Sequence, residues 1–262
     1  MASTLHSLGR VLTDEQLKEF GERGFLVVPD VVAPEVVERA HRRISEIVEA
    51  DPPGEGVVGN HFYFPKAADE PELIAPLTAG GPMAGGAEGP SGFAHAEALA
   101  RPGLLDVPWQ VQIALNIPPF PHRPGRPHID ARNPEPDPAL VPNTFTLLAG
   151  VFVTDQTAED SGNLWVWPGT HRAHAEYFRQ RGVEAFCAYP DIDLPEPEQV
   201  RARAGDLLLA HYLLGHNIGG NFASQSVRRM LYYRVSARGH FDRPERILVE
   251  PWYQYDAVRA LI

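Results

Sequence analysis

The chain has 262 residues, with 23 Lys and Arg against 34 Asp and Glu, so its formal net charge at pH 7 is −11. Hydrophobic residues make up 44% and charged residues 22%, which indicates a folded globular protein rather than a disordered one. The acidic balance argues against a general nucleic-acid binder, because neutralising phosphates requires a basic face.

The N-terminal part, about residues 12–50, is predicted to be helical. Thr13 is expected to cap a helix, because Gln16 follows at the spacing of a capping box, and Gly24 is expected to end that helix. A short strand over 25–28 and a second helix over about 34–48 follow, the helix with apolar residues on one side.

Residues 51–105 are expected to form mostly loop, with a weak helix near 93–100. Glycine and proline cluster at 51–56 and 80–92. A long irregular stretch inside a compact domain is usually a lid or a binding loop.

From about residue 106 to 255 the pattern predicts β-strands. The segments are short, rich in Val, Leu, Tyr and Trp, and separated by turn residues; they are 109–117, 145–154, 163–167, 206–214, 227–236 and 246–253. Evenly spaced short strands without long helices between them favour an antiparallel sandwich or barrel. We therefore expect one domain over 1–262, mainly β with N-terminal helices and a jelly-roll-like barrel.

Cysteine usage and hydropathy bear on the compartment. The single cysteine, Cys187, excludes an internal disulfide framework and a cysteine-based zinc site. No apolar run reaches the roughly 18 residues of a membrane span, and we expect no signal peptide. A cytoplasmic protein that acts on neither membranes nor nucleic acids is the expectation.

The segment 126–132 contains His128 and Asp130 in the order His-x-Asp. On a strand, residues i and i+2 point to the same face, so an imidazole and a carboxylate converge. One more histidine would complete a two-histidine, one-carboxylate set, which leaves open positions on a metal and suits non-haem Fe(II). A surface turn is the competing interpretation, since the pattern alone is common.

A second block supplies further candidates. Residues 204–217 form a predicted strand with histidines at 211 and 216, and Arg228 follows His216 after twelve residues. A guanidinium held on a strand beside an iron site can bind a dicarboxylate through paired hydrogen bonds.

Taken together, these segments resemble the phytanoyl-CoA dioxygenase-like (PhyH) family of Fe(II)/2-oxoglutarate-dependent oxygenases. The similar motifs are 12–30, His128-Ile-Asp130, the segment 160–171 that ends in Pro-Gly-Thr-His, and the block from Gly205 to Arg228. The resemblance implies a double-stranded β-helix, a jelly-roll of cupin type, with Fe(II), the co-substrate 2-oxoglutarate and O2 as cofactors.

The resemblance also implies roles for individual residues. His128, Asp130 and His216 are expected to bind Fe(II) and to form the catalytic centre. Arg228 is expected to bind the distal carboxylate of 2-oxoglutarate. Arg229 stays an alternative, because the spacing from His216 is one residue longer than the family's usual step.

Other contacts are predicted from position. Two polar residues before the metal dyad, Asn116 and Gln110, are expected to reach the metal-side end of 2-oxoglutarate. The candidate substrate contacts are Trp165, Trp167, Asn163 and Tyr63. Core packing is the alternative for the tryptophans, and surface packing is the alternative for Tyr63.

The implied reaction decarboxylates 2-oxoglutarate to succinate and CO2 and abstracts hydrogen from a small organic metabolite or natural-product intermediate. Asp130 favours hydroxylation or another oxidation, since related halogenases carry a small residue there. The alternative substrate is an acyl-CoA thioester, against which the lack of an obvious basic patch argues. The alternative functions are an inactive or Zn-binding barrel of the same fold and a non-enzymatic ligand-binding barrel.

Overall fold

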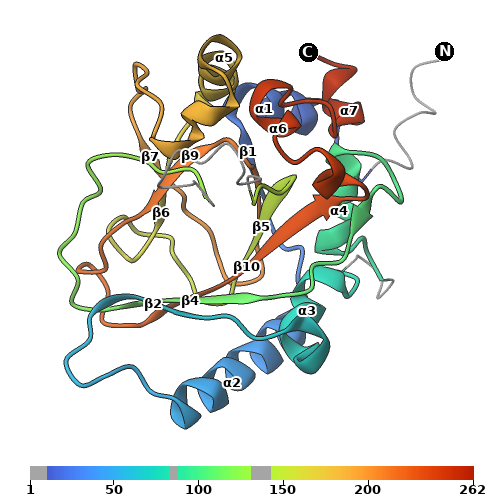
Figure 1. The fold of residues 1–262 in the computed structure, drawn as a ribbon. Helices are drawn as coiled ribbons and strands as arrows, with labels where there is room; N and C mark the ends of the chain where they lie inside the picture. The colour runs from blue at the N-terminus through green and yellow to red at the C-terminus, as the bar shows by residue number, and fades with distance from the viewer. Residues whose placement is uncertain (1–10, 83–87, 131–142) are drawn as a thin grey trace.

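The computed structural model describes residues 11–82, 88–130 and 143–262 (Figure 1). Helix α1 (Asp14–Arg23) begins at a complete capping box: the Thr13 hydroxyl accepts from the backbone of Gln16, whose side chain accepts from the Thr13 backbone. The helix ends at Gly24, which has a φ of 82°, a conformation that glycine adopts without strain. Strand β1 (Phe25–Val28) and helix α2 (Pro34–Ala50) follow, so the predicted N-terminal elements are confirmed.

A seven-stranded antiparallel sheet forms the larger layer, in the order β1-β8-β5-β10-β4-β2, with β3 paired to β10. The strands beyond β1 are β2 (Gly59–Tyr63), β3 (Leu105–Asp106), β4 (Gln112–Ile117), β5 (Leu147–Phe152), β8 (Leu207–His211) and β10 (Arg228–Ala237). A smaller sheet has the order β7-β6-β9, from β7 (Glu198–Gln199), β6 (Leu164–Trp167) and β9 (Gly215–Ile218). Both sheets line one cavity, so they face each other as in a jelly-roll, and the predicted fold class is confirmed.

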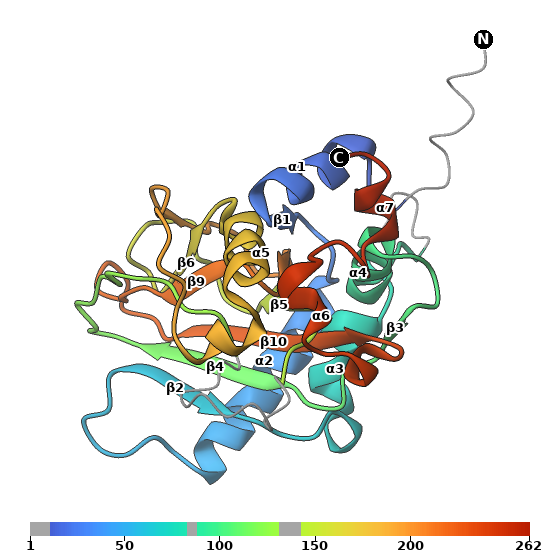
Figure 2. The ribbon, with the colours of Figure 1, turned by 45° about the horizontal axis from the view of Figure 1, so that its top comes forward.

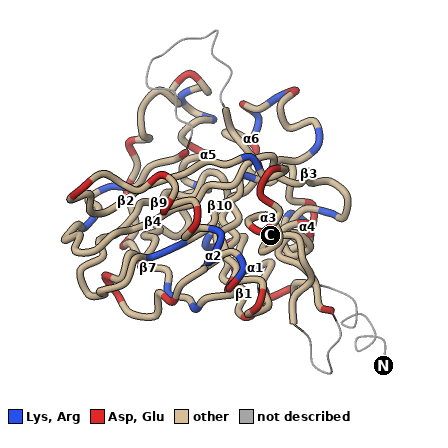
Figure 3. Tube along the Cα trace, turned by 90° about the horizontal axis from the view of Figure 1, so that it is seen from below, with Lys and Arg blue, Asp and Glu red and all other residues tan. Residues whose placement is uncertain are grey.

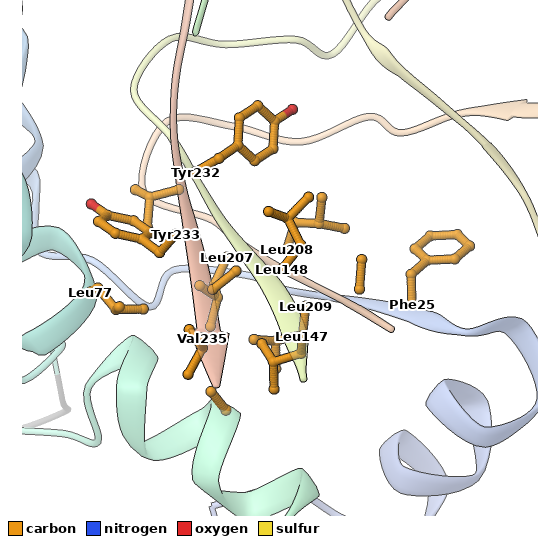
Figure 4. Packing of buried hydrophobic residues seen from close by; sticks show 14 of the residues in the cluster. Phe25, Leu77, Leu147, Leu148, Leu207, Leu208, Leu209, Tyr232, Tyr233 and Val235 are labelled. Carbon is orange, nitrogen blue, oxygen red and sulfur yellow. The ribbon is translucent and has the colours of Figure 1, made fainter. Parts of the chain in front are cut away.

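Helices cover the outer face of the larger sheet (Figures 1 and 2). α2 packs against α3 (Pro71–Thr78), and α4 (Gly92–Leu99) contacts both α3 and β5. Successive residues of β10 therefore have different surroundings: Tyr233 points toward Leu77 and α3, whereas Tyr232 points to the other side of the strand (Figure 4). The Tyr233 hydroxyl donates to the carbonyl of Leu73 at 2.6 Å.

The central strands are buried on both faces, and every residue of β5 and β8 is buried. Leu207, Leu208 and Leu209 are fully enclosed, packed between the helices and the inner cavity (Figure 4). Removing the side chain of such a leucine typically costs about 2–5 kcal/mol.

The stretch 51–105 differs from the predicted loop. It contains β2, a short 3-10 helix (Ala67–Asp69) and α3, and both Leu73 and Leu77 of α3 are fully buried. The helix predicted near 93–100 is confirmed as α4. The helix-period pattern of α3 spans barely two turns and includes Pro76, which obscures it in the sequence.

Two further expectations were wrong. The predicted strand 246–253 is the short helix α6 (Arg246–Val249) followed by turns, and α7 (Asp256–Arg259) comes after it. The strand region also contains an unpredicted helix, α5 (Thr170–Arg181), which precedes a 3-10 helix (Val183–Cys187); another lies at His240–Asp242. The buried face of α5 includes histidine and threonine, so the helical period in hydrophobicity is weak.

Figure 3 shows acidic and basic residues interspersed along the trace rather than segregated. Within the described residues, no helix has the length and apolar character that crossing a membrane requires.

Candidate metal centre

His128, Asp130 and His216 converge, with one ligand atom from each lying within 4.8 Å of the others. Oδ1 of Asp130 is 3.4 Å from Nε2 of His128 and 3.5 Å from Nε2 of His216. Two imidazole nitrogens and one carboxylate oxygen facing a common point form the facial set that suits non-haem Fe(II).

Backbone pairing brings the two histidines together. His128 and His216 exchange both of their backbone hydrogen bonds, at 2.8 and 3.1 Å, so the segment of His128 lies beside β9. Their ring centroids are 4.4 Å apart. Nδ1 of His216 lies 3.0 Å from the carbonyl of Leu214; donation to that oxygen leaves Nε2 free of hydrogen for a metal.

Asp130 is held from both its backbone and its side chain. The hydroxyl of Tyr212 donates to the Asp130 carbonyl at 3.0 Å, and Nη2 of Arg234 donates to Oδ2 at 2.7 Å. Burial alone would raise the pKa of Asp130, but the interactions of its carboxylate with His128, with His216 and with the charge of Arg234 bring it well below its usual value. The carboxylate is therefore ionised and ready to bind a cation at neutral pH.

The centre opens into a cavity of about 330 Å³ between the sheets. The side chain of His128 is 47% exposed, whereas those of Asp130 and His216 are 13% and 12% exposed, so the open side lies toward His128. The apolar walls are Phe62, Phe64, Leu148, Leu164 and Ile218, and the polar ones are Asn60, Gln112, Asn217, Tyr232 and Arg234.

Arg228 is a buried cation near this cavity, with only 2% of its surface exposed. Its Nε donates to the carbonyl of Gly162 at 2.8 Å and its Nη1 to that of Ala114 at 3.3 Å, while Nη2 is buried without a hydrogen-bond partner. Among the described residues no carboxylate pairs with it. Burial lowers the pKa of Arg228 below its usual value, and the nearby Tyr232 offsets only part of this effect. A buried guanidinium without a counter-ion fits an anionic ligand such as the distal carboxylate of 2-oxoglutarate.

Because side chains alternate along a strand, Arg228 and Arg229 point to opposite faces of β10. Arg228 shares the inner face of β10 with Tyr232 and Arg234, which line the cavity. Arg229 points outward, where its Nη1 donates to the carbonyl of His41 and the hydroxyl of Ser45 on α2. Arg229 is therefore directed away from the metal.

The two polar residues expected at the metal-side end of the co-substrate lie elsewhere. Asn116 is buried and pairs in register with Arg228, so it lies beside that arginine and is not among the residues that line the metal cavity. Gln110 donates to the carbonyl of Phe64 and lines a neighbouring cavity. Gln112, on the same face of β4 as Asn116, lines the metal cavity instead.

The four predicted substrate contacts also lie away from the metal cavity. Leu164 of β6 faces the cavity, so Trp165 and Trp167 face the opposite side; Trp165 lines a surface pocket and Trp167 is buried. Asn163 donates to the carbonyls of Gln156 and Val200. The alternative of core packing describes Trp167 best, and Asn163 is also buried.

Tyr63 also lies on the face of its strand that points away from the metal cavity. Asn60 and Phe62 of β2 line the metal cavity, whereas Tyr63 lies on the other face and donates to the carbonyl of Asp51 at 2.5 Å. Its neighbours Phe62 and Phe64 reach the site instead.

Sequence reasoning missed Arg234, Tyr232 and Gln112. The signal was the period of two: residues 230, 232 and 234 share a face with Arg228, and residues 112 and 114 share one with Asn116. This face of the larger sheet points toward the metal because α2 and α3 cover the opposite face.

The chain is similar to known proteins in sequence pattern and in fold. The family model of phytanoyl-CoA dioxygenase (PhyH) matches residues 20–230. HygX from Streptomyces hygroscopicus, solved with nickel and 2-oxoglutarate bound, has a TM-score of 0.59 at 17% identity, over 86% of this chain and 87% of that chain. The non-heme alpha-ketoglutarate-dependent carbocyclase SnoK from nogalamycin biosynthesis has a TM-score of 0.57 at 21% identity, over 87% and 84%.

The epimerase SnoN, also from nogalamycin biosynthesis, has a TM-score of 0.56 at 21% identity, over 85% of this chain and 81% of that chain. No curated protein sequence matches. These structural neighbours share the fold, and the family model covers most of the chain together with all three metal-site residues and Arg228. The chain belongs to the phytanoyl-CoA dioxygenase (PhyH) family.

Proposed function

We propose that the protein is an Fe(II)- and 2-oxoglutarate-dependent dioxygenase that oxidises a small organic metabolite or natural-product intermediate, by hydroxylation or by another reaction that begins with C–H abstraction. Succinate and CO2 are the products of the co-substrate. The observation that carries the proposal is that Arg228, buried with an unpartnered Nη2, shares one strand face with Tyr232 and Arg234 of the metal cavity.

The residues of the site have separate roles in this proposal. His128, Asp130 and His216 hold the metal, while Arg228 binds the distal carboxylate of 2-oxoglutarate. Tyr232 lines the metal cavity and lies between Arg228 and Arg234 on the inner face of β10. When bound, iron, O2 and 2-oxoglutarate supply the oxidising power for C–H abstraction. The apolar walls, among them Phe62 and Leu164, keep water from the reacting substrate.

The size and lining of the cavity favour an organic substrate. About 330 Å³ with mainly apolar walls is in the range of small-molecule sites. Structures of HygX with hygromycin B and of SnoN with nogalamycin RO show that proteins of this fold hold organic compounds. An acyl-CoA thioester remains the alternative substrate, and a Zn-binding or inactive barrel the alternative function.

The test is an anaerobic titration of the metal-free protein with Fe(II) and 2-oxoglutarate, recording the visible metal-to-ligand charge-transfer band. We expect a band in the wild type and none in His216→Ala. In Arg228→Gln half-saturation should need about 10–100-fold more 2-oxoglutarate, because charged hydrogen bonds contribute about 1.5–3 kcal/mol.

Arg229→Gln is the matched control, since the same substitution one residue away removes a cation that faces α2. It should leave the titration unchanged. A folded wild-type protein that binds metal tightly but gives no band would overturn the oxygenase proposal and favour the inactive or Zn-binding barrel.

A further inference from the structure

A second cavity adjoins the metal cavity. It has a volume of about 500 Å³ and shares four wall residues with the first, namely Phe64, Gln112, Tyr232 and Arg234. The two cavities are therefore direct neighbours, separated by no more than these four side chains.

The outer cavity carries large aromatic side chains that the fold leaves in solvent. Trp109 is 72% exposed and Phe241 63% exposed, and both line the cavity together with Phe64, which is 50% exposed. Aromatic rings offer large contact areas to a flat ligand, and removing them from water favours binding. Because three such rings surround one cavity, they form a stacking surface rather than scattered apolar residues.

The charges of the outer cavity are already paired. Asp106 lies 3.1 Å from Nε of Arg238, and Arg234, which also lines the metal cavity, is bound to Asp130. Among the described lining residues no other side chain carries a charge. The remaining polar groups, such as Gln110 and Ser236, are neutral donors and acceptors, which suit hydroxyl, carbonyl or amide groups rather than phosphates.

We propose that this outer cavity is a second substrate subsite, which binds the uncharged, flat, multi-ring part of an extended substrate while the other end lies at the metal. The proposal rests on the proposed oxygenase function for the identity of the reacting end. In this arrangement Trp109 and Phe241 stack on the ring system, and the substrate passes the wall residues that the two cavities share. The substrate class is therefore a neutral polycyclic compound with hydroxyl or carbonyl groups, not an acyl-CoA.

The test uses three uncharged probes of increasing ring number, 2-naphthol, flavone and oestradiol, in equilibrium dialysis against the full chain. Binding is measured in the metal-free protein and, anaerobically, in the protein loaded with Fe(II) and 2-oxoglutarate. We expect affinity to rise with ring number, because only the larger probes span both cavities. In Trp109→Ala the affinity for oestradiol should fall about tenfold, and Phe241→Ala should show a smaller loss.

Phe222→Ala is the matched control, because Phe222 is an aromatic residue with 40% exposure that lines neither of these cavities. It should bind the probes like the wild type. Thermal melts verify that Trp109→Ala folds, as its exposure predicts.

Several outcomes would overturn the subsite: no binding of any probe to the wild type, equal affinity in Trp109→Ala, displacement of oestradiol by coenzyme A, or a dimer that Trp109→Ala dissociates. The charge-transfer band is recorded on the same samples. Probe binding without a band refutes the oxygenase function and leaves the subsite standing, whereas a band without probe binding refutes the subsite alone.

Discussion

The guanidinium of Arg234 lies 2.7 Å from Oδ2 of Asp130, while Oδ1 of the same carboxylate faces both metal-site histidines. The two oxygens are thus assigned to different partners. The other arm of Arg234, Nη1, donates to Oε1 of Gln112 at 2.8 Å, so the guanidinium is fixed between strand β4 and the turn that carries Asp130. The arrangement leaves one carboxylate oxygen for the metal and prevents the group from rotating.

Arg234→Lys should weaken metal binding about tenfold, because the charge is kept but the simultaneous contacts to Asp130 and Gln112 are lost. Isothermal titration with Ni(II) measures the affinity. Arg238→Lys is the control, since Arg238 pairs with exposed Asp106 outside the metal cavity. An unchanged affinity in Arg234→Lys would show that Asp130 needs no such support.

Gly162→Ala should raise the 2-oxoglutarate concentration needed for half-saturation about tenfold, with Ni(II) affinity unchanged. Gly162 has a φ of 85°, and an added Cβ would lie 2.9 Å from Cβ of Arg228, whose Nε donates to the Gly162 carbonyl. The substitution therefore displaces the guanidinium. Gly56→Ala has a similar positive φ but nothing within 4 Å, so it introduces the same backbone strain without the clash and should bind 2-oxoglutarate normally.

Acid should destabilise the protein between pH 6.5 and 4. Burial lowers the pKa of both His174 and His211 to about 4, so the folded state keeps them neutral while the unfolded chain takes up protons below about 6.5. Their contribution is complete above pH 6.5 and is lost as the pH falls to 4.

Urea unfolding at several pH values measures this slope. In His174→Asn the number of protons taken up on unfolding between pH 6.5 and 4 should fall by about one, so the free energy of unfolding should depend less steeply on pH. This holds whatever the effect of the substitution on stability at pH 7. A wild-type stability that is flat from pH 7 to 4 would contradict the neutral burial of these histidines.

Ni(II) at about 100 times its dissociation constant should stabilise the wild type by about 2.7 kcal/mol, because the metal binds only the folded arrangement. For a chain of this size the melting temperature should rise by roughly 5–10 °C. His216→Ala should show no such rise, and EDTA should reverse it in the wild type. A similar rise in His216→Ala would place the metal at another site.

Much of the fold was predictable because its signals are local. The capping box of Thr13 and Gln16 involves residues three apart, and the convergence of His128 with Asp130 follows from the geometry of residues two apart. The antiparallel strands between 112 and 237 were also predictable, from short apolar segments bounded by turn residues. Helix α6 was not, because a short apolar run does not distinguish helix from strand.

The residues around the metal depended on which face of each strand turns inward. The sequence does not distinguish Arg228 from Arg229 as the inward-pointing arginine. Because α2 packs on the outer face of the sheet, Arg229 donates to the carbonyl of His41, and Arg228 is buried inside the barrel. The same choice turns Trp165 away from the cavity. Alternation is a property of one strand, but the identity of the inner face comes from long-range burial, which is decided only when the two sheets and the helices pack together.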